Sequence, residues 1–159
     1  MNHKQFKVTV TRQLPEPVET RMKELFDVNL SNSPHPLTRD QLLEIVKDCD
    51  VLVPTIGDKI DENFIKETGK RLKLIANYGV GFDHIDVLNA TKRGITVTNT
   101  PNVLTEDTAD MAMALIISVP RRIKDGVKKL ADDAWDGWAP NALLGHRIHG
   151  KRLGILGMG

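Results

Sequence analysis

Two short glycine-bearing turns have the residue types and spacing to bind anionic ligands. One follows the apolar run Leu153–Leu156 and reads Gly157-Met158-Gly159, the beginning of the G-x-G-x-x-G turn that places a dinucleotide pyrophosphate at a helix N-terminus. The rest of that pattern, including the residue that selects NAD or NADP, would lie beyond Gly159. We therefore expect the chain to be the front part of a nucleotide-dependent protein, although glycines after a strand are also ordinary turn residues.

The second turn is Asn77–Gly81, which follows the apolar stretch Leu72–Ala76. At the carboxyl edge of a parallel sheet, such a turn lies where ligands bind. Its glycines leave successive backbone N–H groups uncrowded, and these can hold a carboxylate without a cationic side chain. The alternative is a tight strand-to-helix turn that needs glycine for its dihedral angles.

Composition narrows the class of protein. Lys and Arg total 22 and Asp and Glu total 21, giving a net charge of +1 and no field that would attract nucleic acid or an anionic membrane. The single cysteine, Cys49, excludes an internal disulfide. The N-terminus lacks the apolar run of a signal peptide, and Met111–Val119 is too short to span a bilayer. We expect a cytoplasmic protein.

Apolar periodicity predicts alternating strands and helices up to Thr100. Pro17 suits a first helical position, Thr38 and Gln41 form a capping-box pattern, and Asp61 can cap a short helix. Close alternation of this kind indicates an α/β fold with a parallel sheet covered on both faces. Strands are expected at 6–10, 51–53, 72–76 and 95–98, and helices at 17–26, 38–49, 61–69 and 87–94.

The pattern changes after Thr100. Thr105 is expected to cap a helix whose body, Ala109–Val119, is apolar nearly all round and should therefore be buried. Pro120 should end or kink this helix. A further helix is expected from the spacing of Ile123, Val127 and Leu130, and a final strand at Leu153–Leu156.

Segments 76–86, 93–101, 103–110 and 150–159 together resemble the D-isomer-specific 2-hydroxyacid dehydrogenases, and most closely their glyoxylate and hydroxypyruvate reductase branch. The resemblance runs from about Lys7 to the end of the chain. It implies a flavodoxin-like parallel-sheet substrate domain at 1–104 and the truncated start of a Rossmann-type nucleotide domain at 105–159. It also implies NAD or NADP as cofactor, reduction of glyoxylate or hydroxypyruvate to the D-2-hydroxy acid, and a homodimer formed through the nucleotide domain and an arm at 120–145.

The resemblance also assigns binding residues. The backbone amides of Val80 and Gly81 would hold the substrate carboxylate, and Thr108 would approach the nicotinamide. Gly157, Met158 and Gly159 would begin the pyrophosphate turn. The catalytic arginine, glutamate and histidine of the family lie in the second half of its nucleotide domain, and no residue of this chain matches them. The chain alone is therefore expected to contain no catalytic residue and to be inactive.

The remaining reactive residue types have simpler interpretations. We interpret His84 as structural, Cys49 as a core residue, and His146 and His149 as surface residues without the partners that a metal site needs. The basic run that begins at Arg121 is typical of a solvated face. Some glyoxylate reductases place a large aromatic in the partner's active site where this chain has Ala142, so a bulky partner wall is not expected.

Other functions share these motifs. An NAD-sensing corepressor has the same fold, and the downstream histidine or a peptide-binding cleft would distinguish it. An inactive interaction protein of this length is a second alternative. Within the family, phosphoglycerate dehydrogenase and phosphite dehydrogenase are alternative activities.

Overall fold

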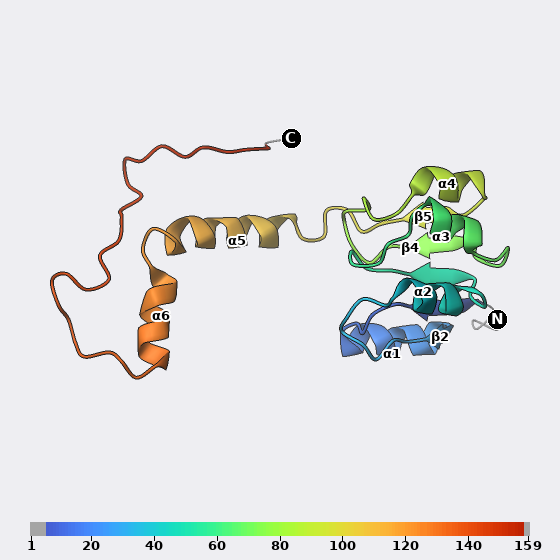
Figure 1. Ribbon diagram of the computed structural model, residues 1–159, viewed down its shortest axis with the longest axis horizontal. Coiled ribbons are helices and arrows are strands. Elements are labelled where there is room, and N and C mark those ends of the chain that lie inside the picture. The colour runs from blue at the N-terminus through green and yellow to red at the C-terminus, as the bar shows by residue number, and fades with distance from the viewer. Residues whose placement is uncertain (1–5, 158–159) are drawn as a thin grey trace. The chain divides into compact units, whose positions relative to one another are not determined.

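The computed structural model describes residues 6–157, which fall into two compact units, one ending at Val103 and the other beginning at Leu104 (Figure 1). The first unit contains a sheet in the order β2-β1-β3-β4-β5, with every neighbouring pair parallel. This 2-1-3-4-5 order is that of flavodoxin-like folds. The predicted parallel α/β class is therefore confirmed. The strands are β1 (Lys7–Val10), β2 (Asp27–Asn29), β3 (Val51–Val53), β4 (Leu74–Ala76) and β5 (Thr96–Thr98).

Helices connect successive strands, and short polar side chains begin most of them. The capping box of Thr38 and Gln41 is present in full, and Asp61 accepts a hydrogen bond from the amide of Phe64 as expected. The first helix begins one residue earlier than predicted, so Pro17 occupies its second position. The helices are α1 (Glu16–Leu25), α2 (Arg39–Val46), α3 (Glu62–Glu67) and α4 (Val87–Lys92).

The core lies on both faces of the sheet. Leu52 and Val53 are consecutive residues of β3, so their side chains point to opposite faces. Leu52 belongs to a large buried cluster with Phe64 and Ile75, whereas Val53 belongs to a second cluster with Val8. Burial on both faces explains why the central strands β3 and β4 are entirely apolar.

The strand β2 was not predicted from the sequence. It pairs only with β1, Lys7 lying opposite Asp27, and its outer residues are exposed. An edge strand of this kind needs no run of apolar residues, so hydrophobic patterning gives little sign of it.

The second unit differs from expectation in its packing. It contains α5 (Thr105–Ser118) and α6 (Ile123–Ala131), but Leu104 rather than Thr105 is the N-cap of α5, and no side chain caps it. The predicted burial of Ala109–Val119 is wrong for the described chain, since neither helix has a buried residue. No helix among residues 6–157 is long and apolar enough to cross a membrane.

The predicted strand at Leu153–Leu156 is also wrong. This segment has no regular secondary structure, and Leu156 is fully exposed. A strand needs a partner for its backbone hydrogen bonds, and no strand occurs between Leu104 and Gly157 to pair with it. Met158 and Gly159 lie outside the described residues.

Replacing Leu52 by alanine should lower the free energy of unfolding by about 2–5 kcal/mol, because its side chain is completely buried in the central strand. Urea unfolding followed by circular dichroism measures this. Leu88→Ala is the matched control; Leu88 is 65% exposed, so its removal should change stability by less than about 0.5 kcal/mol. Equal effects of the two substitutions would contradict the assigned core.

Candidate functional site

Loops that follow four strands meet at the carboxyl edge of the sheet. The amide of Thr11, after β1, donates to the Val53 carbonyl at 3.1 Å, which joins the ends of β1 and β3. The amide of Tyr78, after β4, donates to the Pro54 carbonyl at 2.9 Å. These backbone hydrogen bonds hold the loops after β1, β3 and β4 at one edge, where parallel sheets bind ligands.

Backbone hydrogen bonds also join the turn after β4 to the end of β5 and to the residues that follow it. The amide of Asn77 donates to the Thr98 carbonyl at 2.8 Å, and the amide of Thr100 donates to the Gly79 carbonyl at 3.1 Å. The predicted turn is therefore held from both sides, by the loop after β3 and by the end of β5.

The turn itself presents unpaired donors at the predicted substrate residues. Among the described residues, neither the Val80 nor the Gly81 amide nitrogen has a hydrogen-bond acceptor. Gly81 is exposed and Val80 is half-buried. Two adjacent N–H groups without acceptors can bind an anionic oxygen pair.

The glycines of this turn are not required by a left-handed backbone. The glycines with positive φ are Gly94, Gly137, Gly150 and Gly157, so neither Gly79 nor Gly81 adopts that conformation. A Cβ built on Gly81 would have no neighbour within 4 Å. The alternative that this turn needs glycine for its dihedral angles is therefore not supported. The missing side chain at Gly81 leaves open space beside the free donors.

His84 follows the turn and its side chain contacts the first residue of that turn. Its Nε2 lies 3.0 Å from Oδ1 of Asn77. Burial lowers the pKa of His84 below its ordinary value of 6.5, while the carboxylates of Asp58 and Asp83 oppose that shift. Because burial is the largest effect, His84 is neutral at pH 7.

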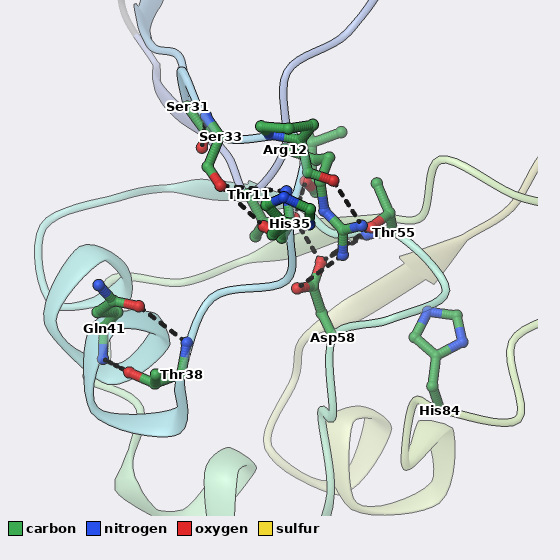
Figure 2. Close-up of polar contacts among 12 residues, drawn as sticks. Thr11, Arg12, Ser31, Ser33, His35, Thr38, Gln41, Thr55, Asp58 and His84 are labelled. Atoms are coloured by element: carbon green, nitrogen blue, oxygen red, sulfur yellow. Dashed lines mark hydrogen bonds and ion pairs between the residues drawn. The ribbon is translucent and has the colours of Figure 1, made fainter.

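An ion pair that the sequence did not indicate lies beside this edge. Asp58 is almost fully buried and accepts hydrogen bonds from the hydroxyl of Thr11 and the amide of Thr55. Arg12 Nη2 lies 3.7 Å from Asp58 Oδ1, and Figure 2 shows the two side chains pointing toward one another. A Cβ on Gly57 would lie only 2.7 Å from Arg12 Nη2, so glycine makes room for the guanidinium.

This pair was missed because its partners are far apart in the sequence. Arg12 and Asp58 each belong to a polar stretch that, read alone, suggests a solvated loop. Their positions in the sequence could have indicated the pair. Each residue comes shortly after a strand, and the carboxyl ends of parallel strands meet at one edge of the sheet.

The residues predicted to bind the cofactor lie in the second unit. Thr108 is exposed on α5, and its hydroxyl donates to the Leu104 carbonyl at 2.8 Å. Gly157 has a φ of 75°, a left-handed conformation that glycine favours. Met158 and Gly159 are outside the described residues. The structure therefore describes two of the four predicted cofactor residues.

The remaining candidates are two histidines of the second unit and the single cysteine. His146 and His149 are exposed. Within residues 6–157, no group of three or more His, Cys, Asp or Glu side chains could hold a metal ion. Cys49 is fully buried, which confirms its predicted place in the core, and burial raises the pKa of its thiol to about 11.

The pKa of His84 in the folded chain should lie below 6.5 in an NMR titration of its ring protons. Between that value and 6.5 the unfolded chain binds more protons than the folded chain. The contribution of His84 to stability should thus be complete above about pH 6.5 and decline as the pH falls through that range. His84→Gln should flatten this part of the profile. A folded pKa above 6.5 would show that the nearby carboxylates outweigh burial.

Sequence comparisons match most of the chain to enzymes of one kind. The profile of the D-isomer specific 2-hydroxyacid dehydrogenase catalytic domain matches residues 8–145. A glyoxylate reductase of Korarchaeum cryptofilum is 43% identical over 154 residues, covering 96% of this chain and 46% of that protein. A glyoxylate reductase of Thermococcus litoralis is 43% identical over 157 residues, covering 96% and 47%. The chain spans about half the length of these relatives.

Solved structures agree with this result. A putative D-isomer specific 2-hydroxyacid dehydrogenase, described as NAD-binding, from Polaromonas sp. superposes with a TM-score of 0.88 at 33% identity, covering 97% of this chain and 48% of that one. A glyoxylate reductase from Paecilomyes thermophila gives a TM-score of 0.70 at 27% identity, covering 100% and 50%. With the profile match extending over residues 8–145, the chain belongs to the D-isomer specific 2-hydroxyacid dehydrogenase family.

Proposed function

We propose that this chain forms the substrate-binding part of an NAD(P)-dependent dehydrogenase that reduces glyoxylate or hydroxypyruvate to the 2-hydroxy acid. The observation that carries the proposal is the pair of unpaired amides at Val80 and Gly81, at the sheet edge where ligands bind. The relatives named glyoxylate reductase support this substrate class. Because the chain spans about half of their length, the activity is proposed for the whole protein.

The part of the reaction assigned to this chain is to bind and orient the substrate. The two N–H groups would each donate to the carboxylate of the 2-oxo acid, and hydrogen bonds to a charged group contribute about 1.5–3 kcal/mol each. Open space beside Gly81 would admit the carboxylate. With that end fixed, the C2 carbonyl takes a defined orientation. A bound nicotinamide supplies the hydride in this class of reaction.

The cofactor assignment rests on the family rather than on geometry. The part of the chain that the structure describes contains only Gly157 of the expected pyrophosphate turn. A pyrophosphate cradle needs the amides of a helix N-terminus, which Gly157 alone does not supply. Binding of NAD or NADP through Thr108, Gly157, Met158 and Gly159 thus stays a prediction. The same holds for a substrate domain at 1–104, a nucleotide domain at 105–159 and a homodimer.

In the whole protein, Gly81→Ala should raise the KM for glyoxylate about tenfold or more, which corresponds to the loss of about one hydrogen bond to the carboxylate. The new methyl group meets no protein atom within 4 Å, so the fold should be unaffected while the carboxylate is displaced. Steady-state kinetics and the Kd for NADH measure the effect, and the Kd should be unchanged.

Gly69→Ala is the matched control, because that glycine also has room for a Cβ and lies away from the turn. It should leave the KM at its parent value. An unchanged KM in a folded Gly81→Ala protein would remove the basis for placing the carboxylate at this turn.

The purified 159-residue chain should not reduce glyoxylate or hydroxypyruvate with NADH or NADPH. The reason is chemical: no residue of the chain matches the arginine, glutamate and histidine on which the family relies, so the chain lacks the group expected to protonate the developing alkoxide. Absorbance at the nicotinamide band measures the rate. Turnover well above the buffer blank would mean that the chain contains its own proton donor.

A further inference from the structure

Each of the two free donors at the turn belongs to a peptide group whose carbonyl is held by an asparagine. The Gly79 carbonyl and the Val80 N–H share one peptide, and Asn77 Nδ2 donates to that carbonyl at 3.1 Å. The Val80 carbonyl and the Gly81 N–H belong to the next peptide group, and Asn99 Nδ2 donates to the Val80 carbonyl at 2.8 Å. In a trans peptide the N–H points opposite to the C=O, and the described chain has no cis peptide. Holding each carbonyl therefore aims the N–H of the same peptide the other way.

Asn77 acts on the turn twice. Its Nδ2 also donates to the Gly81 carbonyl at 2.9 Å, so one amide group joins carbonyls two residues apart. Its side chain is buried, the residue being 2% exposed. A buried amide with both protons engaged is a strongly constrained group, because any rotation would leave polar atoms unpaired.

The contacts of Asn77 also determine the protonation of its neighbour. Carbonyl oxygens only accept, so the nitrogen of the Asn77 amide must face Gly79 and Gly81, and its Oδ1 must face His84. The Nε2 of His84, 3.0 Å from that oxygen, must therefore be the donor. The backbone of His84 is fixed in turn, because its carbonyl accepts from the amide of buried Ile60 at 2.9 Å.

We propose that Asn77 and Asn99 are positioning residues that aim the N–H groups of Val80 and Gly81 at the substrate carboxylate, and that His84 acts through Asn77 by holding its amide in the required orientation. This inference rests on the proposed function. It adds that side-chain amides orient the backbone donors: the asparagines would not touch the substrate, and their removal would leave the donors present but poorly aimed. Asn99 is the only described partner of the Val80 carbonyl, whereas the Gly79 carbonyl also accepts from the Thr100 amide.

The test is a set of single variants of the whole protein, assayed for KM and kcat with glyoxylate and for the Kd of NADH. Asn77→Ala and Asn99→Ala should each raise the KM about tenfold, with a smaller change in kcat and none in the Kd of NADH. Asn89→Ala is the matched control, because it removes another asparagine hydrogen bond, to Asp86 at the N-cap of α4, and should leave the KM unchanged. A general loss of stability would move all three variants together.

The His84 substitutions test the proposed contact between His84 and Asn77. They also test the proposal if an asparagine variant does not fold. His84→Gln keeps a donor for Asn77 Oδ1 and should retain a KM near that of the parent, whereas His84→Met removes the donor and should raise it. Because His84 acts through Asn77, adding His84→Met to Asn77→Ala should produce no further rise. In the 159-residue chain, NMR should detect a slowly exchanging Nε2 proton on His84 that is absent from Asn77→Ala.

The outcomes separate the two proposals. If Gly81→Ala raises the KM while both asparagine variants and His84→Met keep the parent value, the carboxylate binds at the turn but the amides do not position it, and this inference is overturned. A His84 ring protonated on Nδ1 alone would overturn it as well. If Gly81→Ala leaves the KM unchanged, the proposed function itself fails.

Discussion

The parallel register of β4 between β3 and β5 is the constraint on which the candidate site depends. Ile75 lies opposite Leu52 on one side and Val97 on the other, so the three strands end nearly level. The next residue, Asn77, can then bond to the end of β5, and Tyr78 to the loop after β3. A shift of one residue would send each side chain of β4 to the opposite face. The buried amide of Asn77 would then leave the interior of the turn.

Charge has a small part in this arrangement. The half-buried Arg12 and the buried Asp58 beside this edge form an ion pair, and Asp58 also accepts hydrogen bonds from Thr11 and Thr55. Under the proposed function, the contribution of this chain to carboxylate binding would then come from the direction of neutral N–H dipoles. Directed dipoles recognise the planar shape of a carboxylate as well as its charge, whereas a lysine would supply charge with little directional preference.

Features encoded within a few neighbouring residues were predictable from the sequence. The capping box at Thr38, the Asp61 cap and the apolar strand Val51–Val53 were found in this way. Features that depend on distant partners were not. The Asn99–Val80 contact spans 19 residues, and no periodicity reports it. Errors in the second unit have the same origin, because burial of α5 and pairing of Leu153–Leu156 require neighbours that the described residues do not supply.

Because the single cysteine is completely buried, its rate of chemical labelling can be used to follow unfolding of the first unit. Cys49 has no exposed surface, and its thiol, with a pKa of about 11, stays protonated at neutral pH. A thiolate-seeking reagent can modify it only while the core is open, so the labelling rate follows the frequency of that opening. The same burial shields the chain from oxidative cross-linking, because two folded molecules cannot bring their sulfur atoms together.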